Sequence, residues 1–134
     1  MEWFLKASNA GNSNAALNIG FMYDNGQGVE QDDSKAMKWY LKASNDGNAN
    51  AMGNIGFMYD SGHGVEQDYG KAMEWYLKAS DEGSAAAMFS IGDLYRNGNG
   101  ILKDQSLALK WYTKARDSGC AEANASIKEI HDEG

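Results

Sequence analysis

Apolar residues return at helical spacing along most of the chain. Two sets in the first half show the pattern: Ala15, Ile19, Met22 and Tyr23, then Ala36, Trp39, Tyr40 and Ala43. Each set covers one face of a helix. The pattern therefore predicts one helix between Asn12 and about Asn25, and a second between Asp32 and Gly47. The chain contains no proline that would break either helix.

This helix pair is repeated along the chain. The four tryptophans, Trp3, Trp39, Trp75 and Trp111, are separated by intervals of 36 residues. A fixed period of this length is typical of stacked helical units, none of which buries its apolar face alone. We therefore divide the chain into repeats 1–36, 37–72 and 73–108 and a partial repeat 109–134, and treat residues 1–134 as a single domain. The first two repeats are near copies of each other.

Polar residues and glycines mark the ends of the predicted helices. The capping positions are held by Asn12, Asn48, Ser84 and Cys120 for the first helix of each pair, and by Asp32, Asp68 and Asp104 for the second. Asn, Ser and Asp side chains accept hydrogen bonds from free amides at a helix N-terminus. Cysteine is not a good cap, so we expect the last helix to start less firmly. A G-x-G turn, as in Gly26–Gly28, ends each first helix with residues that tolerate left-handed conformation.

Large and small residues recur in phase with the repeat. Gly20 and the alanines of both helices accompany Tyr23 and Trp39, so we expect aromatic side chains to pack against small residues at close helix contacts. Trp39 and Trp75 are predicted to be largely buried between successive repeats.

The combined pattern resembles the Sel1-like repeat family, a relative of the tetratricopeptide repeat. The resemblance rests on N-I-G-F-M-Y-D at 18–24 and 54–60, the G-x-G-[VI] turns, the following aspartates and the W-[FY]-x-K-A segments. It covers essentially the whole chain. It implies a right-handed α/α superhelical solenoid of about eight antiparallel helices that acts as a scaffold or adaptor for other proteins. Some family members carry paired cysteines, but this chain has one cysteine and departs from that branch.

Composition narrows the range of partners. The net charge is −7, the sequence pI is about 4.7 and no run of Lys or Arg occurs, so we expect neither nucleic acid nor membranes as partners. No apolar run is long enough to span a bilayer, and no signal-peptide core is present. Cys120 is the single cysteine, which excludes an intramolecular disulfide. These features leave the compartment unknown and favour the cytoplasm.

No motif for catalysis or cofactor binding stands out. The G-x-G segments lack the preceding strand and third glycine of a dinucleotide site, and they recur with the repeat, which indicates a structural turn. His63 and His131 have no Cys or second His at ligand spacing, so no metal site is expected. Cys120 replaces a capping residue, although a thiol near a helix start can also be reactive. We expect no enzymatic activity and no cofactor.

A second stripe on the first helix of each repeat, outside the core face, is the candidate binding site. Asparagine can donate and accept hydrogen bonds at once, which suits an extended peptide backbone, and phenylalanine can anchor an apolar side chain. By resemblance, the stacked first helices line the concave surface. The candidate partner-binding residues are Asn14, Asn18, Phe21, Asn50, Asn54, Phe57, Phe89, Asp93 and Arg96. Alternatively, these are tolerated surface residues, and the near-copies reflect duplication alone.

The leading hypothesis is a non-catalytic scaffold that binds a protein or peptide on the concave face. The alternatives are a purely structural or consensus-like fragment without a ligand, and a small-molecule-binding or hydrolytic protein. Lys128, Glu129 and His131 make the last helix more polar, as expected of a terminal repeat. At the other end, Trp3 and its neighbours keep the internal pattern. We therefore expect that helix to come from a longer array, to self-associate or to fray.

Overall fold

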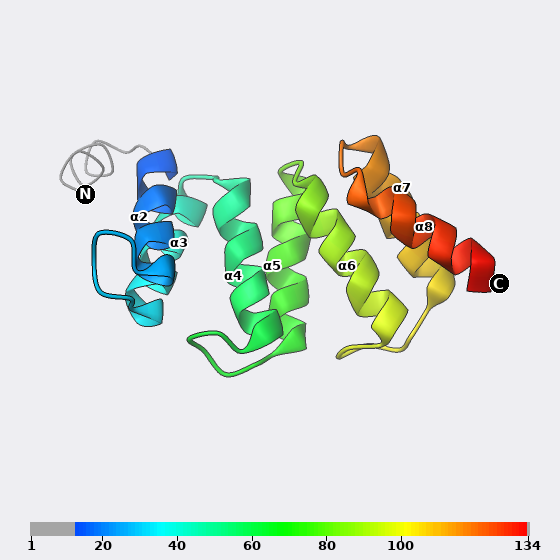
Figure 1. The fold of residues 1–134 in the computed structure, drawn as a ribbon, viewed down its shortest axis with the longest axis horizontal. Helices are drawn as coiled ribbons and strands as arrows, with labels where there is room; N and C mark the ends of the chain where they lie inside the picture. The colour runs from blue at the N-terminus through cyan, green and yellow to red at the C-terminus, as the bar shows by residue number, and fades with distance from the viewer. Residues whose placement is uncertain (1–12, 134) are drawn as a thin grey trace.

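The chain forms an array of helices, shown in Figure 1. The computed structural model describes residues 13–133, and this range contains seven α-helices and no strand. They are α2 (Ser13–Asn25), α3 (Asp33–Asn45), α4 (Ala49–Ser61), α5 (Tyr69–Asp81), α6 (Ala85–Asn97), α7 (Gln105–Asp117) and α8 (Glu122–Glu133). The all-α fold predicted from the 36-residue period is confirmed. The eighth predicted helix, around Trp3, lies outside the described residues.

Each helix packs chiefly against the helices that precede and follow it in the chain. The described part of the molecule is therefore elongated, with α2 at one end and α8 at the other (Figure 1). The closest pairs are α2 with α3, α4 with α5, and α6 with α7. Each of these pairs joins a first helix to the second helix that follows the G-x-G turn. Such an array presents long side faces rather than one central pocket.

Five of the predicted capping side chains cap their helices, whereas Asn12 lies outside the described residues. The Oδ1 atom of Asp32 accepts a hydrogen bond from the backbone nitrogen of Lys35 at 3.1 Å, at the start of α3. The same i to i+3 bond recurs at the other capping residues, which are Asp68, Asp104, Asn48 and Ser84. Each bond satisfies one of the amides that a helix N-terminus leaves without a partner. The sequence therefore determines where these helices begin.

The last helix starts later than its counterparts. Ala49 and Ala85 are the first residues of α4 and α6, whereas α8 begins at Glu122, one position further along the repeat. The preceding turn is tightened by bonds between residues three apart, including Ala123 N to Cys120 O at 3.2 Å. This agrees with the expectation that Cys120 is a poor cap.

The turn after α2 depends on two glycines. Gly26 and Gly28 have φ values of +68° and +74°, in the left-handed region that glycine adopts without a steric penalty. The side-chain amide of Gln31 donates a hydrogen bond to the carbonyl oxygen of Asp24 at 2.8 Å. The turn therefore satisfies one of the carbonyls that the end of α2 leaves free.

Tyrosines from the second helices occupy the centre of the core. Each is buried, and its ring lies against a glycine of the preceding first helix. The pairs are Gly20 with Tyr40, Gly56 with Tyr76, and Gly92 with Tyr112. The predicted packing of large against small residues is thus confirmed. However, the aromatic partner of Gly20 is Tyr40 rather than Tyr23 or Trp39.

The tryptophans lie at the margin of the core. Trp39 and Trp75 pack against it but are only partly buried. The ammonium groups of Lys42 and Lys78 lie over their rings, 5.0 and 4.4 Å from the ring centroids. As predicted, both tryptophans contact the core, but neither is fully buried. The neighbouring tyrosine points into the core, and one step along a helix turns a side chain by about 100°. Lysine shields the outer side of the tryptophan through a cation–π contact.

Candidate partner-binding surface

The nine predicted binding residues lie on α2, α4 and α6, and we call this surface the first-helix face. The exposed members are Asn14, Asn18, Phe21, Asn50 and Phe57. The half-buried members are Asn54, Phe89, Asp93 and Arg96. The accessible part of the face is therefore on α2 and α4, whereas its members on α6 are partly covered.

Exposed side chains of α2 contact the residue that caps α4 and a tyrosine of α3. The amide nitrogen of Asn48 donates a hydrogen bond to Oδ1 of Asn14 at 3.0 Å. Phe21 lies edge-on to Tyr40, with 5.8 Å between ring centroids. Its equivalent one repeat later, Phe57, is 60% exposed, compared with 37% for Phe21. Phe57 is therefore the more accessible apolar anchor of the two.

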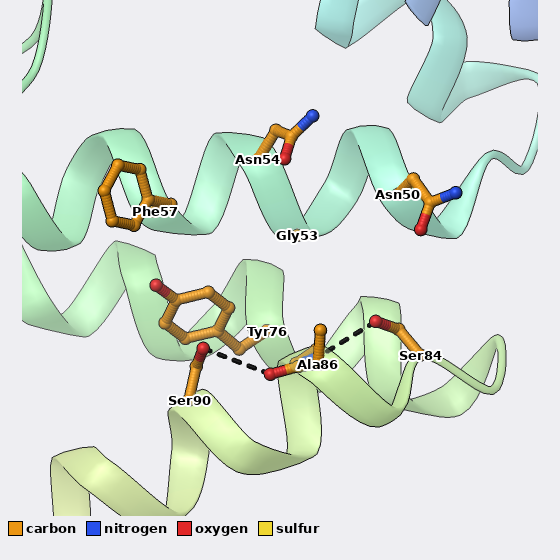
Figure 2. A pocket seen from close by; sticks show the side chains of 9 residues that line it. Asn50, Gly53, Asn54, Phe57, Tyr76, Ser84, Ala86 and Ser90 are labelled. Atoms are coloured by element: carbon orange, nitrogen blue, oxygen red, sulfur yellow. Dashed lines mark hydrogen bonds between the residues drawn. The ribbon is translucent and has the colours of Figure 1, made fainter. Parts of the chain in front are cut away.

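A depression of about 220 Å³ opens between α4 and α6. Figure 2 shows Asn50 and Phe57 on the α4 side, Ala86 and Ser90 on the α6 side, and the ring of Tyr76 between the two helices. The other lining residues are Gly53, Asn54, Ser84 and Ala87. None of the lining residues is charged. The depression therefore offers an aromatic surface surrounded by amide and hydroxyl groups.

The depression depends on residues that differ between repeats. Gly53 stands where α2 carries Leu17, a side chain that is only 7% exposed. Ala86 and Ser90 stand where α4 carries Asn50 and Asn54. These three smaller side chains therefore leave space above Tyr76. At the first repeat boundary, larger side chains occupy the equivalent positions. Asn50, Asn54 and Phe57 were predicted as site residues from the sequence pattern, and all three line the depression. Tyr76 was not predicted, because the sequence pattern of a core tyrosine does not show that it lies close to α4 and α6.

Two buried polar groups lie in and beside the depression. The hydroxyl of Tyr76 donates a hydrogen bond to Oδ2 of Asp60 at 2.9 Å. Burial, and then the negative charge of Asp60, raise the pKa of Tyr76 above its usual range, so the hydroxyl stays protonated at neutral pH. The amide nitrogen of Asn54 is shielded from solvent and donates no hydrogen bond within the described part of the chain. Such a donor is costly when unpaired, so α4 carries unused hydrogen-bonding capacity here.

The predicted site residues on α6 hold the last helices together. Phe89 packs against Tyr112, with 5.3 Å between ring centroids. Asp93 accepts a hydrogen bond from the hydroxyl of Tyr112, and burial raises the pKa of this carboxyl. Arg96 forms an ion pair with Glu129 on α8, with 2.9 Å between Nη1 and Oε2. These side chains therefore hold α6 against α7 and α8, and they are less exposed than Asn18, Asn50 and Phe57.

Two further depressions, of about 440 and 400 Å³, lie at the first two G-x-G turns. Their linings are equivalent in the two repeats: Tyr23, Val29, Glu30, Gln31, Asp32 and Lys35 in one, and Tyr59, Val65, Glu66, Gln67, Asp68 and Lys71 in the other. Because the same residue types recur with the period, these depressions are a feature of the turn. This supports the structural interpretation of the G-x-G segments.

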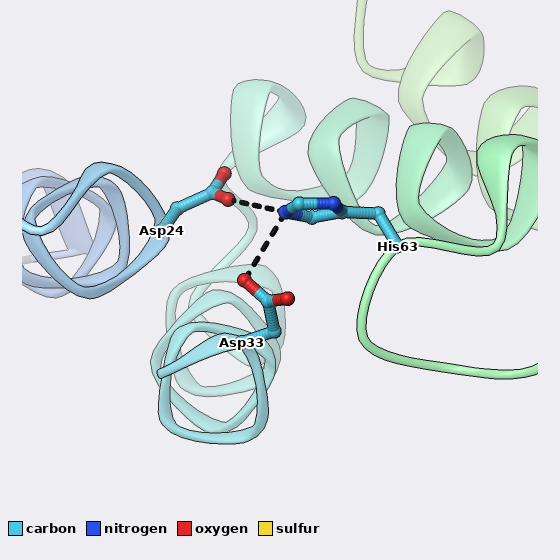
Figure 3. A group of neighbouring side chains, drawn as sticks. All are labelled: Asp24, Asp33 and His63. Carbon is cyan, nitrogen blue, oxygen red and sulfur yellow. Dashed lines mark hydrogen bonds and ion pairs between the residues drawn. The ribbon is translucent and has the colours of Figure 1, made fainter. Parts of the chain in front are cut away.

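A cluster of three side chains joins the first two repeats at another place (Figure 3). His63 follows α4, and its Nε2 atom lies 3.0 Å from Oδ1 of Asp24 and 3.1 Å from Oδ1 of Asp33. Sequence spacing suggested no ligand partners for His63, but these two come from the preceding helix pair. A comparison of the repeats could have drawn attention to His63, because the equivalent positions in the other repeats are Gln27 and Asn99.

The fold defines a class of protein, the α/α solenoid built from repeated antiparallel helix pairs. The sequence matches the Sel1 repeat at residues 1–12, 13–48, 49–84 and 85–120, and the chain belongs to this family. The matched units 13–48, 49–84 and 85–120 start at the first helix of each pair, whereas the tryptophan-based division starts within the second. The 36-residue period is the same in both.

Solved structures agree with this assignment. A Sel1 repeat protein from Oxalobacter formigenes is 35% identical with a TM-score of 0.91, and the match covers 96% of this chain and 52% of that protein. A protective antigen of uropathogenic Escherichia coli with an SLR fold is 34% identical with a TM-score of 0.93; the match covers 100% of this chain and 29% of that protein. The chain thus spans about half of the first relative and less than a third of the second. Helicobacter pylori cysteine rich protein B, at 23% identity, a TM-score of 0.71 and coverage of 91% and 92%, shares the fold.

No curated protein matches the chain. Sel1 repeat proteins are generally non-catalytic scaffolds, and the solenoid fold commonly serves protein interaction. None of the helices within residues 13–133 is long and apolar enough to cross a lipid bilayer.

Proposed function

We propose that the chain is a non-catalytic protein-interaction module that binds an extended peptide segment of a partner on the first-helix face. The depression between α4 and α6 receives one apolar side chain of this segment, next to Phe57. The observation that carries the proposal is the origin of this depression. It exists because Gly53, Ala86 and Ser90 replace larger residues of the neighbouring repeats, and not because of the fold alone.

The size and chemistry of the depression favour a peptide over a small-molecule substrate. A volume of about 220 Å³ lies below the range of roughly 300–1,000 Å³ that is typical of small-molecule sites. It suits a single side chain. Asn50 is exposed and can donate to and accept from a peptide backbone, and Tyr76 and Phe57 provide apolar contact. Because none of the lining residues is charged, binding should depend only weakly on salt unless the partner is basic.

The first experiment selects binding peptides from a displayed random library and measures their affinity by fluorescence polarisation. Gly53→Leu is the test variant, because it introduces the residue of the first repeat. Apart from its chain neighbours and the backbone of its own helix, nothing lies within 4 Å of a Cβ at position 53, so the chain should fold normally. We expect the larger side chain to occupy the depression and to weaken binding at least tenfold while the melting temperature stays the same or rises.

The matched control is Ala125→Leu. Ala125 occupies the equivalent position on α8, is exposed and lies outside the depression. Peptide affinity should be unchanged in this variant. The double variant Asn18→Ala with Asn54→Ala should weaken binding without a loss of helicity. Unchanged affinity in Gly53→Leu, or equal loss in Ala125→Leu, would contradict the proposed site. Failure to select any peptide would support a structural array without a ligand.

A further inference from the structure

We propose that Asp24, Asp33 and His63 form a binding site for a divalent transition-metal ion, with Zn²⁺ as the probe, which links the first two repeats. Each residue offers one donor atom, and the three atoms all lie within 4.8 Å of one another. Asp24 lies in the last turn of α2, Asp33 is the first residue of α3, and His63 lies in the turn between α4 and α5. A bound ion would therefore join two helices of one repeat to a turn of the next.

The distances are close to those that a zinc ion requires. Oxygen and nitrogen ligands bind Zn²⁺ at about 2.0–2.2 Å, so neighbouring donors of a tetrahedral site are roughly 3.3–3.6 Å apart. Nε2 of His63 lies 3.0 and 3.1 Å from the two carboxylate oxygens. If the histidine nitrogen and the carboxylate oxygens moved apart by a few tenths of an ångström, the ion would fit between them. The half-exposed imidazole leaves the site open for a water molecule as a further ligand.

The arrangement of donor atoms leaves at least one of them without a partner unless a cation binds among them. Both carboxylate oxygens approach the same imidazole nitrogen (Figure 3). If Nε2 carries a lone pair, three electron-rich atoms face one another and repel. If it carries a proton, that single N–H forms one well-directed hydrogen bond, which the geometry assigns to Asp24. Oδ1 of Asp33 is then shielded from solvent without a hydrogen bond in the described part of the chain. A metal ion satisfies all three atoms at once.

Neighbouring groups hold the ligands in place. The second carboxylate oxygen of Asp24 accepts a hydrogen bond from the hydroxyl of Tyr40 at 3.0 Å. Such outer contacts orient metal-binding side chains and strengthen metal binding. Gly64 lies directly against the side chain of Asp33, where a larger residue would push the turn away. Glycine at this position therefore allows His63 to reach the start of α3.

The cluster is specific to one repeat boundary. At the next boundary the equivalent positions are held by Asp60, Tyr69 and Asn99, which retain one carboxylate and no imidazole. The trio is therefore not imposed by the 36-residue repeat. A set of one imidazole and two carboxylates suits first-row transition metals, whereas Ca²⁺ and Mg²⁺ prefer oxygen ligands alone.

Isothermal titration with Zn²⁺ tests the proposal, together with melting curves with and without the ion. We expect one ion per chain and a higher melting temperature, because a ligand of the folded state stabilises it. His63→Gln places the residue of the first repeat at this position and should fold. It should weaken Zn²⁺ binding at least tenfold. Long-range ¹H–¹⁵N spectra of the imidazole should show Nε2 of His63 as the bound nitrogen.

Two controls separate metal binding from structural effects. Asp24→Asn and Asp60→Asn each alter a carboxylate that accepts a tyrosine hydrogen bond, but only Asp24 borders His63. Zn²⁺ affinity should fall in the first variant and stay within twofold in the second. His131→Gln, which alters the other histidine, should also leave it unchanged. Zn²⁺ binding that persists in His63→Gln would overturn the proposal. So would a wild-type protein that binds no Zn²⁺, since the cluster would then be held by hydrogen bonding alone.

Discussion

The ring of Tyr40 lies against the backbone of Gly20, and this contact sets the distance between α2 and α3. A Cβ atom on Gly20 would stand 2.5 Å from Cε1 and 2.6 Å from Cδ1 of the tyrosine ring. The ring is fully buried. Glycine is therefore required here by a close approach between helices rather than by backbone conformation.

Gly20→Ala should therefore destabilise the protein by about 1–3 kcal/mol, the usual cost of overpacking a core. The steric clash outweighs the gain of up to about 1 kcal/mol that alanine brings to a helix. Urea unfolding followed by circular dichroism measures the difference. Gly53→Ala is the control, because a Cβ at position 53 meets open space. It should stabilise the protein by about 0.5–1 kcal/mol. Equal effects at the two glycines would contradict this account of the core.

The two neighbouring aromatics of α3 should differ in their contribution to stability. Tyr40→Ala removes a fully buried ring and should cost about 3–5 kcal/mol. Trp39→Ala removes a ring that is only partly buried and covered by Lys42, so it should cost less, about 1.5–3 kcal/mol. Chemical unfolding of both variants under one set of conditions gives the comparison. A larger loss of stability in Trp39→Ala than in Tyr40→Ala would contradict this prediction and would show that the tryptophan contributes more to the core.

Alkaline pH should unfold the protein through its buried tyrosines. Burial raises the pKa of Tyr40, Tyr76 and Tyr112 above the ordinary value of 10.0, and a nearby aspartate adds to each shift. Above this value the unfolded chain releases tyrosine protons that the folded chain retains. Stability is therefore complete below about pH 10 and falls as the pH rises further. Tyr76→Phe should make this decline less steep in urea unfolding measured across pH 9–11. Tyr95→Phe controls for the removal of a tyrosine, and an equal slope in both variants would argue against buried tyrosines as the cause.

Cys120→Ser should strengthen the start of α8. Asn48 and Ser84 cap the equivalent helices with a side-chain oxygen, and Cys120 stands in their place. A hydroxyl there should accept a hydrogen bond from the backbone nitrogen of Ala123 and stabilise the protein by roughly 0.5–2 kcal/mol. Hydrogen exchange at the first amides of α8 should slow. The reverse change, Ser84→Cys, should weaken α6 by a similar amount, and no effect in either direction would mean that these caps contribute little.

The sequence by itself determined the repeat and the ends of the helices. The 36-residue period, the cap at Asp32 and the turn at Gly26 all appear in the structure where the pattern predicted them. They depend on contacts within a few residues. A capping carboxylate reaches an amide three positions away, and a left-handed glycine ends its own helix. Such features can be predicted because both partners lie in the same short segment.

The tertiary structure decided which side chains meet across repeats. Tyr40 is fully buried, whereas Trp39 is only partly buried. The packing of α2 and α4 against α3 decides which face of α3 lies in the core. The depression beside Phe57 arises from Gly53 on one repeat and Ala86 on the next, and neither residue indicates a cavity alone. His63 meets Asp24 and Asp33 because the turn after α4 packs over the preceding helix pair. These contacts join residues far apart in the chain, and side-chain volume and helix packing, rather than spacing, bring them together.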